Sequence, residues 1–152
     1  MRFLGIDPGL VNTGFAVLED KRIIVSGVIR RPGSTIDRIH AISREIHTKL
    51  EEYQPGYTAI ETAFYGKNPK SLIKSAQLIG AILYILREKN SRIIQLHPNT
   101  LKRIITGNGR ASKEQVIYMV KNILQIEKDL KPDEADAIAI ALAASLHYDS
   151  RD

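Results

Sequence analysis

Apolar residues in the first hundred positions fall largely into short runs, which is the pattern of β-strands buried in a sheet. Two of these runs meet at Asp20-Lys21, a polar break that predicts a tight turn between antiparallel strands. Pro-Gly pairs and helical patterns separate the other runs. Strands are therefore predicted at residues 2–7, 13–20, 21–30, 57–61 and 91–97.

Other segments repeat apolar residues three or four positions apart, as on one face of a helix. Pro69 suits the first turn of one such segment, and Gly107 predicts the end of another. Ser112 and Gln115 form an S-x-x-Q capping box that opens a further helix. Helices are therefore predicted at residues 34–53, 69–89, 98–107, 112–124 and 131–146.

The order of these elements predicts one α/β domain over residues 1–152, in which strands separated by helices run parallel. If strands 2–7 and 57–61 are neighbours in mid-sheet, Asp7 and Glu61 lie at its carboxyl edge. Open α/β sheets bind ligands at that edge. Each acid taken alone is more simply explained as the first residue of a loop.

The last predicted helix, KPDEADAIAIALAASL, carries three acids at its start and is otherwise almost entirely apolar. Acids in a first turn complement the helix dipole, which explains one or two of them. Asp133 and Asp136 are three positions apart and share a face. If this helix packs on the sheet with its start at the carboxyl edge, four carboxylates converge, from Asp7, Glu61, Asp133 and Asp136.

Carboxylates gathered in this way would repel one another and raise each other's pKa. The sequence shows no matching cluster of Lys, Arg or His to neutralise them. Mg²⁺ prefers carboxylate oxygens, and a pair of such ions can activate a water molecule and stabilise the leaving oxygen of a phosphodiester. We therefore expect Mg²⁺ as the cofactor, two ions per subunit, with Mn²⁺ able to replace it.

The net charge of +5 and the pI near 9.5 favour a polyanionic partner. The absence of cysteine excludes disulfides and thiolate metal sites, and it is compatible with a reducing cytosol. No signal peptide is apparent, and the apolar C-terminal run is too short for a membrane span. A cytoplasmic protein with no membrane association is expected.

Four segments resemble the RuvC family of bacterial Holliday-junction resolvases, in the family's order and spacing: FLGIDPGLVNTGFAV, AIETAFYGKNPKSLIKSAQLIGA, LKRIITGNGRASKEQVIYMV and DEADAIAIALA. The resemblance covers essentially the whole chain. It implies an RNase H-like fold with a five-stranded mixed sheet flanked by helices. It implies catalytic, metal-binding roles for Asp7, Glu61, Asp133 and Asp136, although some relatives have His at the position of Asp133. Glu134 matches no catalytic position and is expected to be solvated.

The resemblance further implies a homodimer that makes two symmetry-related nicks in a four-way DNA junction. The nicks leave 5′-phosphate and 3′-hydroxyl ends that a ligase can seal, in homologous recombination and DNA repair. The family cuts preferentially at a short thymine-containing sequence. It works with the RuvA–RuvB branch-migration motor, and no nucleotide cofactor is expected for this chain.

A basic segment, LKRIITGNGRASK, surrounds the turn at Gly107 and Gly109. It is either a solvated loop or a phosphate-binding rim, and a capped helix start with free amides favours the rim. RuvC proteins carry important lysines at the positions of Lys102 and Lys113. We predict DNA contacts from Lys102, Arg103, Arg110 and Lys113.

Two aromatic residues, Phe64 and Tyr65, follow closely on Glu61. An aromatic residue just past a strand usually belongs to the core, but the following Gly, Lys and Asn indicate an exposed loop. A ring there could stack on a base that is unpaired at the crossover. We predict that Phe64, Tyr65 and Lys67 contact DNA, with Phe64 the stronger candidate by resemblance.

The predicted helix 69–89 is apolar on nearly all sides, and one sheet cannot cover all of this apolar surface. Either a second helix of the same chain or another subunit covers the remainder. Ala76 and Gly80 would allow a partner helix to approach closely, and two equivalent cuts need two equivalent sites. The predicted dimer face comprises Leu72, Ile73, Ala76, Ile79, Gly80 and Leu83.

Three other functions compete with this interpretation. The first is a nucleotide phosphotransferase of the actin and sugar-kinase type, in which a phosphate-binding loop with D-x-G also follows a strand. That fold needs a second, similar half, which 152 residues do not supply. Binding of ATP would favour this alternative again. A junction-binding protein that does not cut would gain by replacing acids at its DNA face. A related nuclease, such as the YqgF-like group, is disfavoured by the full-length match.

Overall fold

The strands of the computed structural model form a mixed sheet. They are β1 (Arg2–Asp7), β2 (Thr13–Glu19), β3 (Arg22–Ile29), β4 (Tyr57–Glu61) and β5 (Arg92–Leu96). The model describes residues 1–62 and 68–151, and in these ranges the sheet has five strands in the order β3-β2-β1-β4-β5. The β1–β2 and β2–β3 pairs are antiparallel, and the β1–β4 and β4–β5 pairs are parallel. The predicted mixed sheet, with β1 beside β4, is confirmed.

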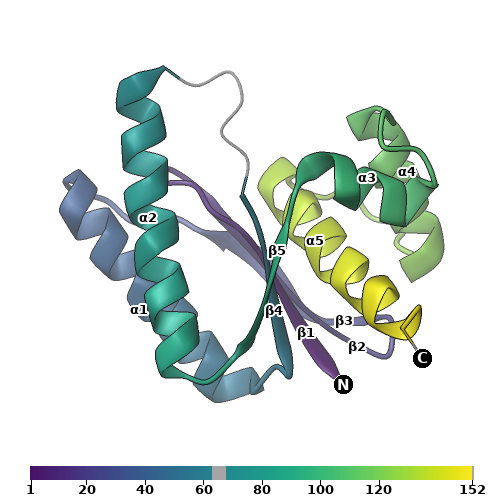
Figure 1. The fold of residues 1–152 in the computed structure, drawn as a ribbon, viewed down its shortest axis with the longest axis horizontal. Helices are drawn as coiled ribbons and strands as arrows, with labels where there is room; N and C mark the ends of the chain where they lie inside the picture. Colours follow the sequence, from purple (N-terminus) through teal and green to yellow (C-terminus); the bar gives the residue numbers. More distant parts are fainter. Residues whose placement is uncertain (63–67, 152) are drawn as a thin grey trace.

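Helices cover both faces of this sheet. They are α1 (Thr35–Tyr53), α2 (Pro69–Glu88), α3 (Pro98–Thr106), α4 (Lys113–Leu124) and α5 (Pro132–Asp149). Figure 1 shows α1 and α2 on one face and α3, α4 and α5 on the other. The prediction ended the last helix at residue 146, whereas α5 continues to Asp149. Among residues 1–62 and 68–151, no helix combines the length and hydropathy needed to cross a bilayer.

Each face of the sheet has its own hydrophobic core, which explains why the strands read as continuous apolar runs. In β1, Leu4 and Ile6 point towards α1 and α2, where they pack with Ile46 and Ile82. Phe3 belongs to the opposite core, which α5 fills with Ala137, Ile138, Ala139, Ile140, Ala141, Leu142, Ala143 and Ala144. The alternation of side chains along β1 therefore divides its residues between two helical layers.

Local signals determine several of the turns and helix starts. Asp20 and Lys21 both have positive φ, 49° and 57°, as a two-residue hairpin turn requires. Ser112 accepts a hydrogen bond from the backbone N–H of Gln115, whose side chain accepts one from the Ser112 N–H, so the predicted capping box is confirmed. Ser34 caps α1 in the same way with Asp37.

Two glycines let α5 lie directly on the sheet. A Cβ atom at Gly5 in β1 would stand 2.3 Å from the Ala137 carbonyl oxygen, and one at Gly14 in β2 would stand 2.0 Å from the Asp133 carbonyl oxygen. Any side chain at either position would push the helix away from the strands. Glycine at these two places therefore allows the first turn of α5 to approach the end of β1.

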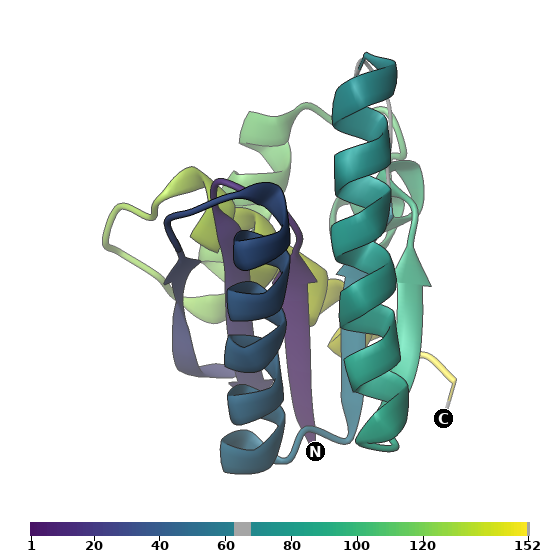
Figure 2. The same cartoon turned by 90° about the vertical axis from the view of Figure 1, so that its left-hand side faces the viewer.

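The carboxyl ends of β1 and β4 lie at the end of the molecule where α1 and α2 both begin (Figure 2). The amino terminus and the C-terminal ends of α1 and α2 lie at the other end. Since α5 also starts beside β1 and β5 ends beside β4, this end of the domain holds the carboxyl ends of β1, β4 and β5 and the starts of α1, α2, α3 and α5.

Candidate metal centre and nucleic-acid interface

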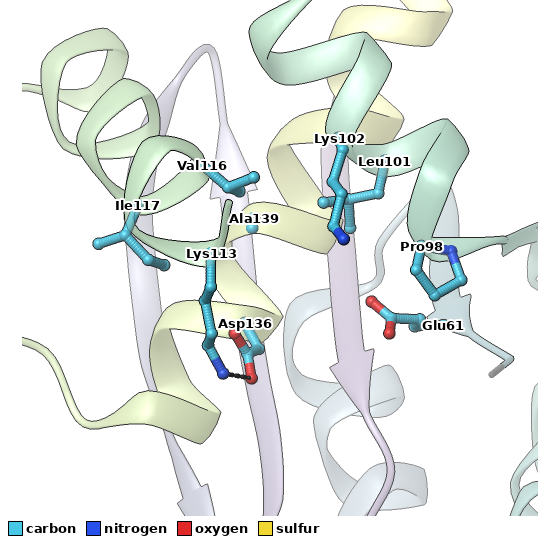
Figure 3. A pocket seen from close by; sticks show the side chains of 9 residues that line it. All are labelled: Glu61, Pro98, Leu101, Lys102, Lys113, Val116, Ile117, Asp136 and Ala139. Carbon is cyan, nitrogen blue, oxygen red and sulfur yellow. Dashed lines mark hydrogen bonds and ion pairs between the residues drawn. The ribbon is translucent and has the colours of Figure 1, made fainter. Parts of the chain in front are cut away.

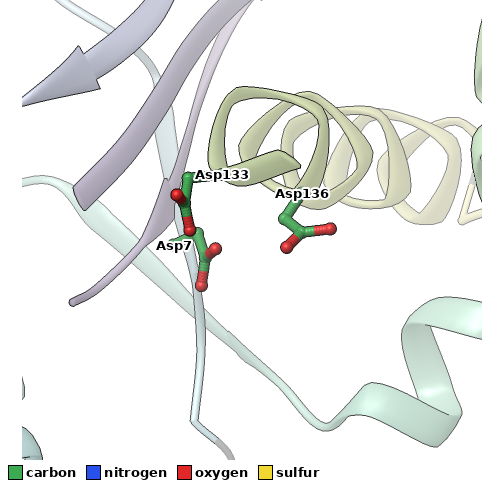
Figure 4. A group of neighbouring side chains, drawn as sticks. All are labelled: Asp7, Asp133 and Asp136. Carbon is green, nitrogen blue, oxygen red and sulfur yellow. The ribbon is translucent and has the colours of Figure 1, made fainter. Parts of the chain in front are cut away.

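Three aspartates meet at the carboxyl edge of the sheet. Asp7 is the last residue of β1, and Asp133 and Asp136 lie in the first turns of α5. Each offers a carboxylate oxygen, and these oxygens all lie within 4.8 Å of one another (Figure 4). An all-carboxylate set at this spacing could hold a hard divalent cation. The structure thus brings together three of the four acids that were expected to converge.

Glu61 lies outside this three-aspartate group. It ends β4, beside β1, and lines a cavity of about 240 Å³ together with Asp136, Lys102 and Lys113 (Figure 3). Its charge still raises the pKa of Asp7, and the charge of Asp136 adds to the effect of burial in raising the pKa of Glu61 itself. Glu61 therefore faces the same site from the neighbouring strand, without joining the group of three.

Asp7 shows how strongly the site resists negative charge. Burial, which is the largest cause, and the charges of Asp136, Glu61 and Asp133 together raise its pKa to about 7, against the opposing charge of Lys113. An acid whose ordinary pKa is 3.8 is thus about half protonated near neutral pH. A bound cation would stabilise the ionised form of Asp7, so the three aspartates suit a site that holds a metal ion.

One lysine partly neutralises the acids, although the sequence shows no cluster of basic residues that matches them. The Nζ of Lys113, at the start of α4, lies 3.0 Å from Oδ2 of Asp136 (Figure 3). Burial lowers the pKa of Lys113, but the hydrogen bond and charge of Asp136, with the charges of Asp7 and Asp133, outweigh it and raise the pKa. The sequence missed this pair because its members are 23 positions apart on different helices.

The predicted DNA-contacting residues divide into three sets. Lys102 and Lys113 line the cavity beside Glu61 and Asp136, and the charge of Lys102 acts to lower the pKa of Glu61. Arg103 and Arg110 are exposed and do not line that cavity. Phe64, Tyr65 and Lys67 lie outside the described residues.

Glu134 is not the solvated acid that was expected. It is half-buried, and its Oε1 accepts a hydrogen bond of 2.6 Å from the Ser26 hydroxyl on β3. This bond joins the first turn of α5 to the sheet next to Asp133. Ser26 is a polar residue inside an apolar strand, which is the one signal in the sequence that could have pointed to such a contact.

Several residues of the predicted dimer face are exposed on the outer surface of α2. Ile73 is 59% exposed, Ala76 and Gly80 are exposed, and a Cβ at Gly80 would meet no atom within 4 Å. Leu72 and Leu83 are half-buried. Ile79 was wrongly assigned to this face, because it is only 7% exposed and packs in the core between α2 and the sheet.

The chain matches known proteins over most of its length. The family model described as crossover junction endodeoxyribonuclease RuvC matches residues 3–144. Proteins of that name from Hydrogenovibrio crunogenus and Aliarcobacter butzleri are 40% and 38% identical, each over 93% of this chain and over 85% and 96% of their own lengths.

Solved structures extend the likeness to three dimensions. Thermus thermophilus RuvC in complex with a Holliday junction substrate aligns with a TM-score of 0.92 at 26% identity, covering 99% of this chain and 96% of that one. The yeast mitochondrial Holliday junction resolvase aligns at 0.67 with 16% identity, over 96% and 80% of the two chains, which shows a shared fold. The fold is RNase H-like, and this chain belongs to the RuvC family of crossover junction endodeoxyribonucleases.

Proposed function

We propose that this chain is a structure-specific endodeoxyribonuclease that resolves four-way DNA junctions by paired symmetrical nicks, each leaving a 5′-phosphate and a 3′-hydroxyl. It would act in homologous recombination and DNA repair, as its family does. One observation carries the proposal: Asp7, Asp133 and Asp136 gather their carboxylates beside a cavity lined by Lys102 and Lys113. Acids to hold cations and lysines to hold phosphate are the two parts that phosphodiester hydrolysis needs.

The three aspartates would hold Mg²⁺, with two ions per subunit and Mn²⁺ as a substitute. When bound, the metal would polarise the phosphate and lower the pKa of the attacking water. Glu61, on the neighbouring strand, would complete the set from the other side of the cavity. The raised pKa values of Asp7 and Glu61 support this assignment, because burial and neighbouring carboxylates disfavour the ionised forms, which a bound cation would stabilise.

The two lysines would bind the scissile phosphate, which the negatively charged acids would otherwise repel. Lys113 is 61% exposed, so its side chain can turn from Asp136 to a phosphate oxygen once a cation takes over that carboxylate. Lys102 comes from α3 and reaches the same cavity from the opposite side (Figure 3). Together they would orient the scissile phosphate and stabilise the charge that develops on it.

Two equivalent cuts need two equivalent sites, so we propose a homodimer formed through the outer surface of α2. Its exposed members are Ile73, Ala76 and Gly80, with Leu72 and Leu83 at the margin. Phe64, Tyr65, Lys67, Arg103 and Arg110 remain predicted DNA contacts. A RuvA–RuvB complex as partner and a cytoplasmic location also remain predictions.

The direct test is to incubate the protein with a synthetic mobile four-way junction and Mg²⁺, without nucleotide, and to map the ends produced. Paired nicks at symmetrical positions, with ligatable ends and with no cutting of a linear duplex, are expected. Asp7→Asn should bind the junction and leave it uncut. Full cutting by Asp7→Asn, or equal cutting of the linear duplex, would contradict the proposal.

A further inference from the structure

A second, larger groove opens on the other side of the aspartates from Lys102 and Lys113. Its volume is about 690 Å³, and it is lined by the β1–β2 turn, the residues that lead into α1, the first turns of α2, and Asp133. The Lys102 cavity takes Asp136 from the same group of acids. Since the three aspartates lie within 4.8 Å of one another, the metal centre stands between the two cavities.

Two basic side chains line this groove without forming an ion pair with an acid among the described residues. Arg38 projects from α1 and Lys74 from α2. Across residues 1–62 and 68–151, no carboxylate oxygen lies within 4.0 Å of either side chain's nitrogens. Among the described residues that line the groove, Asp133 is the one acid, and a metal ion would neutralise it.

The groove is held in shape by hydrogen bonds of its own residues. The Nε of Arg38 donates to the Gly33 carbonyl oxygen at 3.0 Å, which fixes the direction of the guanidinium group. The Thr13 hydroxyl donates to the Gly9 carbonyl oxygen at 2.7 Å and accepts from the Gly9 N–H, which closes the β1–β2 turn. A guanidinium group held in this way loses less conformational entropy when a ligand arrives than a free one would.

The remaining lining groups suit phosphates and sugars better than bases. Thr35 and Ser71 supply hydroxyls, and Asn12 supplies an amide, whereas the Ser34 hydroxyl is bonded to Asp37. Side chains of these types, together with Arg and Lys, make most protein contacts to the sugar–phosphate backbone. Among the described residues that line this groove there is no Phe, Tyr, Trp or His, so these residues offer no ring for a base to stack on.

We infer that this groove binds the phosphate backbone of the DNA strand on the side of the metal centre away from Lys102 and Lys113, through Arg38 and Lys74. The cut strand would then cross the aspartates between two pairs of cations, which would hold the scissile phosphate against them. This inference rests on the proposed nuclease function and adds a second binding segment to it.

The test compares Arg38→Ala/Lys74→Ala with a charge-matched control, Arg22→Ala/Arg44→Ala. Arg22 and Arg44 are exposed, and Arg22 begins β3 at the end of the sheet opposite the acids. Binding of a fluorescent four-way junction is titrated in EDTA, which prevents cutting, over a range of KCl concentrations. Loss of two phosphate contacts should reduce the slope of log Kd against log salt by about 2 and weaken binding by about tenfold or more at low salt.

A phosphate scan locates the contact. Methylphosphonates that neutralise single phosphates beside the scissile position should weaken binding by the wild type, while those facing the groove should leave the Arg38→Ala/Lys74→Ala variant unaffected. The charge-retaining variant Arg38→Lys/Lys74→Arg should recover most of the salt slope, which separates loss of charge from misfolding. An unchanged slope, an equal loss in the Arg22/Arg44 control, or equal sensitivity of variant and wild type to every methylphosphonate would overturn the inference.

These binding results are independent of cutting. If the wild type binds the junction but never nicks it with Mg²⁺, the proposed function fails while the groove is still tested. If the wild type nicks the junction and the two double variants bind alike, the groove assignment alone fails.

Discussion

The ammonium group of Lys113 lies 3.0 Å from Oδ2 of Asp136, where it pairs with a carboxylate that a metal ion would also use. Lys113 begins α4 and Asp136 lies in the first turns of α5, so the packing of two helices sets this contact. The lysine and the cation compete for one acid. Binding of metal should therefore release Lys113 for a phosphate, which couples assembly of the centre to capture of substrate.

Lys113→Ala should separate metal binding from cutting. Without the lysine, Asp136 keeps its full charge, so Mn²⁺ should bind about twofold to fivefold more tightly, the equivalent of an exposed ion pair. Cutting should nevertheless slow by about 100-fold or more, because a donor to the phosphate is lost. Calorimetric titration with Mn²⁺ and single-turnover junction cutting measure the two effects.

Lys121→Ala is the matched control for this experiment. Lys121 lies on the same helix and pairs with Asp129 at 3.8 Å, away from the acids. Neither metal affinity nor cutting should change in it. Weaker Mn²⁺ binding by Lys113→Ala would show that the lysine supports the metal site and does not compete with it.

Asp7 should make the metal-free protein less stable as the pH rises. Its pKa is about 7 in the folded chain against an ordinary 3.8, so the folded state holds its proton more firmly than the unfolded state does. The resulting stabilisation is complete below about pH 4 and is lost as the pH rises to about 7. In EDTA, Asp7→Asn should therefore raise Tm at about pH 8 by about 2–4 °C, roughly 1 kcal/mol, and have less effect at about pH 5.

Glu127→Gln, at an exposed acid outside the site, serves as the control and should not change the pH dependence. Mg²⁺ should raise the Tm of the wild type at the higher pH and leave that of Asp7→Asn nearly unchanged. Equal Tm shifts in the two proteins would place the stabilising ion elsewhere.

The hydrogen bond from Ser26 to Glu134 should position Asp133, the preceding residue in α5. Ser26→Ala leaves a half-buried carboxylate without its donor, which should cost about 1–2 kcal/mol of unfolding free energy. The cutting rate of bound junction should fall more than junction affinity does, because the hydrogen bond affects the acids and not the basic cavity.

A double-mutant cycle with Glu134→Gln isolates this contact. Ser26→Ala should cost less in the Glu134→Gln background than in the wild type, both in unfolding free energy and in cutting rate. Strict additivity of the two substitutions would show that the hydrogen bond makes no contribution of its own.

Gly80→Arg should break the proposed dimer without harming the subunit. The position has open space around it, and Arg has a higher helix propensity than Gly by roughly 0.8 kcal/mol, so the subunit should be equally or more stable. Sedimentation should show at least about tenfold weaker association, and paired nicking should be lost. His40→Arg, at an exposed site on α1, adds similar bulk and charge and should remain dimeric.

Much of the architecture could be predicted from the sequence because its determinants are local. Short apolar runs predicted the strands, helical spacing of apolar residues predicted the helices, and the capping box at Ser112 marked the start of α4. The parallel placement of β1 and β4 followed from the helix between them, and it put Asp7 and Glu61 at one edge. The apolar character of α5 predicted a helix buried on nearly all sides, as it is.

The tertiary structure alone decided the contacts between residues far apart in the chain. Ser26 and Glu134 are 108 positions apart, and their contact depends on how α5 is rotated against β3. Lys113 meets Asp136 only because α4 packs beside α5, and Ile79 turns inward because of the exact rotation of α2. Periodicity indicates which residue types share a face, but helix rotation and depth depend on the fit of side chains across layers. Here that fit includes the two glycines of β1 and β2 on which α5 rests.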